Sequence, residues 1–524
     1  MNFIKAVRGK RYFGRGILVP IFLAIFCMLT VFNYVNFTVD ARAPFSVDEN
    51  DALFFSKQLA EKGTFVWHSD LNEKYDVDFF RPIHIKPLGN DNYTSRKPFG
   101  YIILLAIARR LHIINFVSSI IAALGIIGVY LLSKEIFNEK VAIFSGIILS
   151  VFPAYIFMAN SHFNNLPPAV LAIFSLYFFI KTIKSGRNYL IYAFLCGLFL
   201  GIAITQRTPY VLLILPYIAV SLVLLFKRKV VWLDLLMGIL GGAIPVVFLL
   251  VLNNRIYGKA LASGHEIESI FPFKIAFGNY WHSFYDYLFS YSPLIFFFGI
   301  LGLLFHFWSK KNRYFDFVVI ATSAILFLFY GRSAGGWGGD YPIVTGSMAR
   351  YFLLTYIFLI IYTAYFLVEV VWGKKFGKPY ALIIALFILI TSLRFAFAPV
   401  GSSLVDYRNV TDDFASLKKI AENSPKNSIF ITKDLDRAVF PVRQTLVYYT
   451  LYDYNKAGGV PYFFQSMEPV NAKEELVPMV ETLRNDDFKV YVTQEASDLV
   501  SELKKAGYTL KGMGRQSVRV YEVE

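Results

Sequence analysis

The sequence is poor in charge and in cysteine. Only 17% of its 524 residues are Asp, Glu, Lys or Arg, whereas about a quarter of the residues of an average soluble domain are charged. Both cysteines, Cys27 and Cys196, lie in apolar runs, which excludes a disulfide-built exterior domain and a Cys-rich metal site. In contrast, 56% of the residues are hydrophobic and 18% are aromatic, which is more apolar surface than soluble cores of ordinary size can bury. The composition therefore predicts an integral membrane protein.

Long apolar runs support this class. A hydrocarbon core of about 30 Å needs roughly 20 apolar residues per helix, and the sequence contains eleven such stretches. They lie near 17–36, 113–133, 142–159, 166–183, 189–204, 209–226, 230–252, 291–308, 315–330, 351–372 and 380–397. The first run follows five basic residues but is longer than the apolar part of a usual signal peptide, so we interpret it as a retained anchor.

The net charge of +15 is unevenly distributed. From Ser403 to the end, 16 Lys and Arg face 18 Asp and Glu, so the whole excess belongs to the membrane part. Alternate short loops between the apolar runs are all basic, near 134–140, 181–187, 227–229, 310–313 and 374–378. Cytoplasmic loops carry such a bias. The pattern predicts membrane topology rather than nucleic-acid binding: a multi-pass protein of a prokaryotic cell membrane, with the N-terminus inside and the C-terminus outside.

The composition changes sharply near residue 400, which predicts two domains: a membrane domain over 1–400 with a long outer loop over 37–98, and an exterior domain over 401–524. Alternating apolar residues predict strands at 428–432, 489–493 and 517–523, and helical patterns occur near 411–423, 472–484 and 495–506. We therefore expect a small α/β domain. It contains no histidine and no Gly-rich phosphate loop, which favours binding or spacing over chemistry.

Two acidic residues, Asp48 and Glu49, follow the first apolar run at the start of a predicted surface helix. A carboxylate that is partly desolvated at the lipid boundary can act as a general base on a hydroxyl. On spacing alone, however, the two residues could equally cap the helix and favour its macrodipole.

Two arginines are expected at the outer boundary of later spans. Arg207 stands in the turn before Pro209, and Arg350 follows a Gly-rich outer loop that contains Trp337 and Asp340. Two arginines at one depth could bind a lipid phosphate, although a single cation there could merely anchor a helix by snorkelling. Trp337 could serve as an interfacial anchor or stack on a sugar.

In combination and in order, these segments resemble the polytopic GT-C glycosyltransferases, in the branch of the protein O-mannosyltransferases and the lipid A aminoarabinose transferase. The resemblance covers roughly residues 17–372. Its motifs are the outer-loop Asp48-Glu49, the Lys97-Pro98 segment before the second span, the Gly201–Pro209 turn, and the Gly-rich loop that ends in Arg350-Tyr351.

The resemblance implies an α-helical GT-C-like membrane protein that transfers a hexose or pentose, with inversion, from a polyprenyl-phosphate donor to a protein, lipid or glycan acceptor on the outer face. It implies that Asp48 is the catalytic base, that its neighbour Glu49 belongs to the catalytic pair and orients the acceptor or supports the helix, and that Arg207 lies near the carrier phosphate. Arg350 is not implied by the resemblance; we add it as a second phosphate ligand because it is expected at the same depth as Arg207. Lys97 is a possible substrate contact. No cofactor and no obligatory metal are expected.

The sequence departs from this family at one place. Relatives often carry a second carboxylate between the third and fourth spans, where this chain reads Asn160 to Pro167 without an acidic residue. His162 or Asn165 could replace it in hydrogen bonding, Asp340 could come from another loop, or activity could be weakened or lost.

A different function class stays open. A non-catalytic lipid carrier, a flippase or an assembly scaffold of the same pathway could use the same basic residues to hold a lipid headgroup. A flippase should place ionisable residues within its spans, whereas the conspicuous charges here are predicted at the outer boundary.

Overall fold

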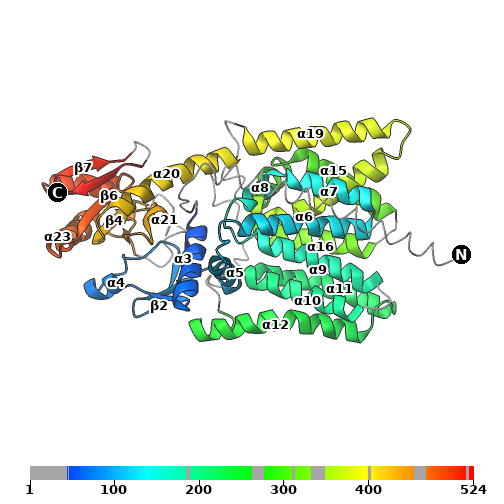
Figure 1. The fold of residues 1–524 in the computed structure, drawn as a ribbon, viewed down its shortest axis with the longest axis horizontal. Coiled ribbons are helices and arrows are strands. Elements are labelled where there is room, and N and C mark those ends of the chain that lie inside the picture. Colours follow the sequence, from blue (N-terminus) through cyan, green and yellow to red (C-terminus); the bar gives the residue numbers. More distant parts are fainter. Residues whose placement is uncertain are drawn as a thin grey trace. The chain divides into compact units, whose positions relative to one another are not determined.

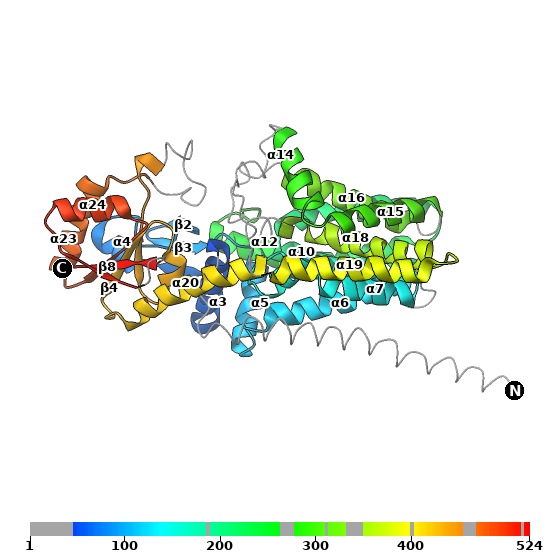
Figure 2. The same cartoon turned by 90° about the horizontal axis from the view of Figure 1, so that it is seen from above.

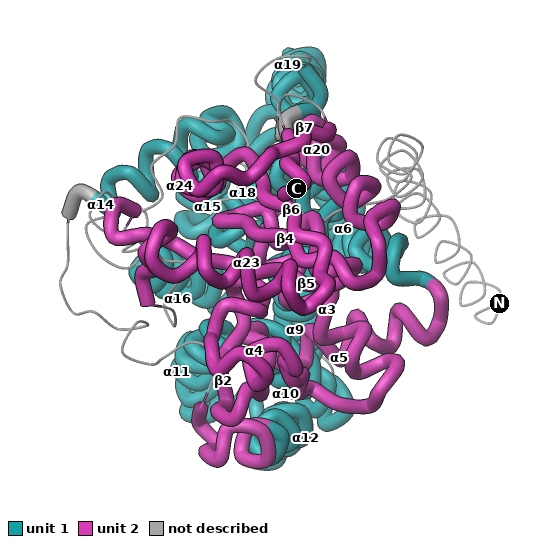
Figure 3. Tube along the Cα trace, turned by 90° about the vertical axis from the view of Figure 1, so that its left-hand side faces the viewer, with its two compact units in different colours: residues 1–37, 113–252, 271–406 teal, residues 38–112, 253–270, 407–524 magenta. Residues whose placement is uncertain are grey.

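The computed structural model describes residues 44, 46–184, 189–262, 277–309, 313–331, 349–398, 403–453, 468–514 and 518–524. The chain divides into two compact units (Figure 3). Unit 1 comprises residues 1–37, 113–252 and 271–406, and unit 2 comprises residues 38–112, 253–270 and 407–524. Each unit is thus assembled from three separate stretches of chain.

Unit 1 is built from apolar helices. They are α6 (Val117–Ile136), α7 (Glu139–Ser150), α8 (Pro153–Ala159), α9 (Leu166–Lys184), α10 (Tyr189–Gln206), η1 (Thr208–Leu213), α11 (Ile214–Phe226), α12 (Trp232–Tyr257), α14 (Phe277–His282), η2 (Ser283–Phe289), α15 (Pro293–Trp308), α16 (Arg313–Tyr330), η4 (Arg350–Phe352), α18 (Leu353–Tyr365), η5 (Phe366–Val371) and α19 (Gly377–Phe397). Helix α6 packs against both α7 and α9. Figure 1 shows these three helices running along one another, and Figure 2 shows α6 and α7 from above.

Length and composition allow these helices to cross a membrane. Eight helices of the described residues qualify, or up to ten if two bent pairs, α7 with α8 and residues 279–289 with α15, each count as one span. Ten of the eleven predicted apolar runs thus have a counterpart among these helices. The first run, 17–36, lies outside the described residues.

The helices pack through small residues and expose apolar faces. Helix α9 packs against both α6 and α10, and α18 is the most enclosed of the candidate spans. At Gly197 and Gly201 of α10 a Cβ atom would lie 1.8 Å and 2.5 Å from backbone oxygens of α12, so glycine is required for this approach. The outward sides of α12 and α19 carry exposed Ile, Leu and Phe residues, as a lipid-facing surface requires.

The first described helix of unit 2 is α3 (Val47–Lys62). It is the helix that was predicted to start at Asp48 and Glu49. Ser46 is its N-cap, and the helix ends at Gly63, where φ is 71° and the backbone is left-handed. Strands β1 (Val66–His68), β3 (Asn92–Ser95) and β2 (Ile85–Gly89) form an antiparallel sheet in that spatial order. The helices α4 (Asp70–Tyr75) and α5 (Phe99–Arg110) complete this part, and α5 packs against α3.

The C-terminal part of unit 2 is the predicted α/β domain. Its sheet has the order β5-β4-β6-β8-β7, with β4 parallel to β5 and β6 and with β8 antiparallel to β6 and β7. The elements are α20 (Ser403–Asn423), β4 (Ser428–Thr432), α21 (Asp436–Val439), β5 (Gln444–Val447), η7 (Ala472–Leu476), α23 (Val477–Asn485), β6 (Lys489–Thr493), α24 (Ser497–Lys505), β7 (Leu510–Met513) and β8 (Val520–Val523). The predicted fold class is confirmed. Strands β5 and β7 were not predicted.

The outer loop and the C-terminal segment share one hydrophobic core. Phe80 is fully buried in a cluster with Ile429, Ile431 and other side chains of the five-stranded sheet, and Ile83 packs with Val447 and Tyr449. The sequence analysis assigned this loop to the membrane domain, whereas in the structure it belongs to the same compact unit as the C-terminal segment. A three-stranded sheet is too small to bury Phe80 and Ile83 by itself.

Candidate active site

The two acidic residues at the start of α3 have different surroundings. Glu49 is 1% exposed. Its Oε2 accepts the Ser46 N–H at 3.2 Å, and Ser46 Oγ accepts the Glu49 N–H at 3.2 Å. This reciprocal pair is a capping box, which satisfies two backbone donors at the helix N-terminus. The helix-cap interpretation therefore applies to Glu49.

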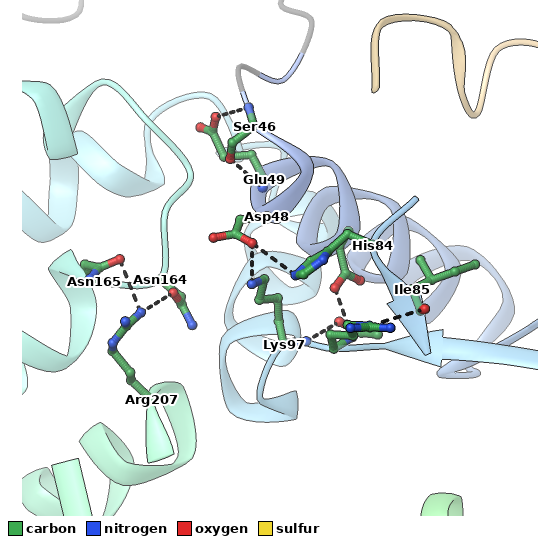
Figure 4. A network of polar contacts seen from close by, with 12 residues as sticks. Ser46, Asp48, Glu49, His84, Ile85, Lys97, Asn164, Asn165 and Arg207 are labelled. Atoms are coloured by element: carbon green, nitrogen blue, oxygen red, sulfur yellow. Dashed lines mark hydrogen bonds and ion pairs between the residues drawn. The ribbon is translucent and has the colours of Figure 1, made fainter. Parts of the chain in front are cut away.

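The Asp48 carboxylate takes no part in the helix cap and contacts basic side chains instead. Its Oδ1 lies 2.5 Å from Lys97 Nζ and 3.3 Å from His84 Nε2, and Figure 4 shows both groups reaching the same oxygen while the second oxygen points away from them. The Asp48 side chain is 25% exposed, whereas those of Lys97 and His84 are 7% and 2% exposed. Asp48 is thus held by buried partners but reachable from solvent.

The predicted substrate contact Lys97 is therefore a neighbour of the predicted base. It precedes α5, and its backbone N–H donates to Ser95 Oγ at 2.8 Å, so the end of β3 fixes its position. His84 was missed by the sequence analysis, because a single histidine before a short strand carries no motif.

Two further carboxylates lie close to His84 within unit 2. Asp51 and Asp436 line one narrow space with His84. Burial raises the pKa of Asp51 to about 7, although the Lys97 charge and the Arg96 N–H oppose the shift. Burial also raises the pKa of Asp436 to about 7 against the Ile83 N–H, which Asp436 Oδ2 accepts at 3.0 Å. The surroundings of His84 are therefore acidic and almost dry.

Arg207 lies between α10 and η1 in unit 1, within a set of neutral acceptors. Its Nη1 donates to Asn164 Oδ1 at 2.8 Å and to Asn165 Oδ1 at 3.3 Å, and its Nε donates to Tyr330 OH at 2.7 Å. Its guanidinium carbon lies 5.0 Å from the centroid of the Tyr351 ring. Within the part of the chain that the structure describes, these contacts hold the guanidinium with neutral side chains.

Arg350 belongs to the same cluster. Its guanidinium carbon lies 3.9 Å from the Phe163 ring centroid and 5.0 Å from that of Tyr351, and its backbone oxygen accepts Asn165 Nδ2 at 3.3 Å. Asn165 and Tyr351 therefore contact both arginines, which brings together two residues that are 143 positions apart in the sequence. Asn164 and Tyr330 belong to this set but were missed, because neither stands in a recognisable pattern.

The remaining predicted site residues have other places. His162 is buried, and its Nε2 lies 3.1 Å from the backbone oxygen of Ile114. Trp337 and Asp340 lie outside the described residues. Among the described residues, no group of three or more His, Cys, Asp or Glu side chains is arranged to hold a metal ion.

Comparisons with known proteins identify this architecture. A family model described as dolichyl-phosphate-mannose-protein mannosyltransferase matches residues 101–252. The structure of ArnT from Cupriavidus metallidurans bound to undecaprenyl phosphate superposes with a TM-score of 0.57 at 13% identity, over 96% of this chain and 97% of that chain. The chain has the GT-C fold. Its resemblance to GT-C glycosyltransferases is thereby confirmed over nearly the whole length.

Two further GT-C structures agree. Archaeal oligosaccharyltransferase AglB from Archaeoglobus fulgidus, in complex with an inhibitory peptide and a dolichol-phosphate, has a TM-score of 0.50 at 13% identity over 96% of this chain and 74% of that chain. A variant of the arabinofuranosyltransferase AftD from Mycobacteria has a TM-score of 0.53 at 12% identity over 98% of this chain and 41% of that chain. A comparison with curated proteins finds no match.

Proposed function

We propose that this GT-C protein is a membrane glycosyltransferase that moves a sugar from a polyprenyl-phosphate carrier to a hydroxyl acceptor, with Asp48 as the general base. The observation that carries the proposal is the different placement of the two acids of α3. Glu49 is engaged in the helix cap, whereas Asp48 is turned out of the cap, partly exposed and fixed by two buried nitrogen groups.

The lipid carrier is supported by two structural relatives. ArnT is described as bound to undecaprenyl phosphate, and AglB as bound to a dolichol-phosphate. In this chain the Arg207 and Arg350 cluster offers guanidinium groups that are oriented by Asn and Tyr side chains. A guanidinium binds phosphate oxygens through parallel hydrogen bonds, so this cluster is our candidate for the donor phosphate site.

The proposed reaction balances without a nucleotide. The acceptor hydroxyl gives its proton to Asp48, its oxygen bonds to the anomeric carbon from the face opposite the phosphate, and the carbon–oxygen bond to the phosphate breaks. The phosphodiester donor carries one negative charge and the released phosphomonoester carries up to two. Arginines near the phosphate stabilise that additional charge as it develops.

Lys97 would adjust the base. An ammonium 2.5 Å from Asp48 Oδ1 favours the ionised carboxylate that must accept the proton. His162 and Asn165 stay possible substrate contacts in this proposal, Asn165 through the arginine cluster and His162 in the same turn. Trp337 and Asp340 keep the role of possible substrate ligands from the Gly-rich loop.

The sidedness is also a proposal. The basic loops that alternate along unit 1 favour a cytoplasmic N-terminus, which places Asp48 and the C-terminal domain outside. Labelling single cysteines introduced at exposed Asp70 and Lys134 with a membrane-impermeant reagent tests it. We expect reaction at position 70 in intact cells and at position 134 only after lysis.

The function is tested with purified protein in liposomes that contain synthetic polyprenyl-phosphate sugars. Asp48→Asn should lower sugar transfer by at least about 100-fold, as loss of a general base does, while the thermal unfolding midpoint stays unchanged. Asp70→Asn is the control, because Asp70 is an exposed carboxylate of the same unit. Unchanged transfer by Asp48→Asn would remove Asp48 as the base, and donor binding without turnover by the unaltered protein would indicate a carrier instead.

A further inference from the structure

His84 connects the candidate base with the C-terminal domain of unit 2. Its Nε2 lies 3.3 Å from Asp48 Oδ1, and its side chain is 2% exposed. His84 directly precedes strand β2, whereas Lys97 follows the end of strand β3 and reaches the same oxygen. Two nitrogen groups from different segments of chain therefore converge on one carboxylate oxygen (Figure 4).

The backbone around His84 is fixed on both sides. The preceding residue, Ile83, donates its N–H to Asp436 Oδ2 at 3.0 Å, and Asp436 starts α21 of the C-terminal domain. The following residue, Ile85, pairs with Ser95 in the antiparallel sheet. A side chain on such a doubly fixed backbone has little freedom to move, and the C-terminal domain supplies one of the two fixing contacts.

We propose that His84 is a positioning residue, which holds the carboxylate of Asp48 in one orientation, and that Asp436 of the C-terminal domain sets the place of His84. This inference rests on the proposed function. The 3.3 Å contact between Nε2 and Asp48 Oδ1 is an ion-pair distance, and the proposal requires the Nε2–H to align with Oδ1 when an acceptor hydroxyl binds, as catalytic hydrogen bonds often do. A donor to the ionised carboxylate both fixes its rotamer and favours its ionised form, so the other oxygen can meet an acceptor hydroxyl.

The charged groups near His84 come from every element packed around it. Helix α3 contributes Asp48 and Asp51, the end of β3 leads to Lys97, and α21 contributes Asp436. The pKa values of Asp51 and Asp436 are about 7, so either group could produce a limb of the pH profile. The pH dependence of kcat must therefore be measured in variants that lack each carboxyl group as well as in the unaltered protein.

The test measures kcat as a function of pH for three variants in which His84 is replaced. His84→Phe keeps the ring volume and removes the donor, and His84→Asn keeps a polar group that is too short to reach Asp48. Both should lower kcat about tenfold near neutral pH and move the acid limb of the profile up by about one unit, since a donor to the ionised base is lost. His84→Gln places an amide nitrogen near the Nε2 position and should restore kcat to within about threefold.

The control is His68→Phe, which removes an exposed histidine of the same sheet that pairs with Glu73. Its profile should match that of the unaltered protein. The acid limb should keep its place in Asp51→Asn, and also in Asp436→Asn, because Asn keeps an acceptor oxygen for the Ile83 N–H. Asp436→Ala removes that acceptor and should move the acid limb in the same direction as His84→Phe; an unmoved limb would show that Asp436 does not set the place of His84. The Michaelis constant for the donor should change little in all His84 variants.

The outcomes separate the two proposals. If His84→Phe or, where that variant does not fold, His84→Asn lowers kcat equally at every pH without moving the acid limb, or has no effect, His84 does not position the base. If Asp48→Asn is itself active, the proposed function fails first. If both hold, combining Asp48→Asn with His84→Phe should cost no more than Asp48→Asn alone, because the two residues act as one unit.

Discussion

Each unit of this protein holds a carboxylate against a histidine, and the two pairs differ in access. In unit 2, Asp48 contacts His84 and Lys97 and remains 25% exposed. In unit 1, Asp316 of α16 is fully buried. It lies 2.7 Å from His306 Nδ1 of α15 and accepts a hydrogen bond from the Tyr362 hydroxyl of α18.

The difference distinguishes a reactive carboxylate from a structural one. The Asp316 pair joins three helices, and the Phe137 ring lies 4.8 Å from the His306 ring, so an external hydroxyl cannot approach. Ionisable residues thus also occur within the candidate spans, and not only at the ends of those spans. A carboxylate that takes a proton from a substrate must stay reachable, as Asp48 does.

Opposite mutational effects would sharpen this comparison most. We expect Asp316→Ala to destabilise the protein by about 3 kcal/mol, because it leaves the buried His306 Nδ1 and Tyr362 hydroxyl without their hydrogen-bond partner. Asp48→Asn, whose amide oxygen can still accept from Lys97, should lower transfer at least about 100-fold and leave the free energy of unfolding in detergent within about 1 kcal/mol of that of the unaltered protein. If Asp48→Asn unfolded the protein and Asp316→Ala did not, the two roles would have to be exchanged.

Arg207→Lys tests the phosphate side of the same proposal. The substitution keeps the charge but loses the planar fork that donates to Asn164 and Tyr330. The Michaelis constant for the polyprenyl-phosphate donor should rise about tenfold, with a smaller change for the acceptor. Equal changes for donor and acceptor would assign Arg207 to folding.

A pH series tests the two buried carboxyl groups whose pKa values are raised, Asp51 and Asp436. The pKa values of Asp51 and Asp436 are about 7 in the folded protein, above the usual 3.8. The folded state therefore retains protons that the unfolded state releases, and the stability present below pH 4 is lost as the pH rises towards 7. The unfolding midpoint should fall over this range, and the double variant Asp51→Asn with Asp436→Asn should flatten the slope. An unchanged slope would place both pKa values near their usual range.

The smallest effect is expected for substitutions of Glu49. They distinguish the capping role of Glu49 from the proposed catalytic role of Asp48. Glu49→Gln can keep the capping box and should leave transfer and stability nearly unchanged, whereas Glu49→Ala should cost about 1 kcal/mol through the lost cap. Kinetics and thermal unfolding of the two variants check this. A loss of transfer in Glu49→Gln comparable to that of Asp48→Asn would assign chemistry to both acids.

The sequence predicts the membrane architecture well, because apolar runs of about 20 residues have few other uses. Strands β4, β6 and β8 were predictable from alternation, while β5 and β7 were missed: β7 contains a glycine and two exposed positions, and β5 is four residues long. The resemblance pointed to Asp48 and Arg207. His84, Asn164 and Tyr330 could not be found, because their places depend on contacts between distant segments that leave no local pattern.

The shared core of the outer loop and the C-terminal sheet has a consequence for biosynthesis. Phe80 is synthesised early, yet the first strand that covers it is made about 350 residues later, roughly 18–70 s at ordinary translation rates. Throughout that interval the nascent loop must keep its aromatic side chains soluble or chaperoned. A segment that is made much later therefore completes the core that the outer loop begins.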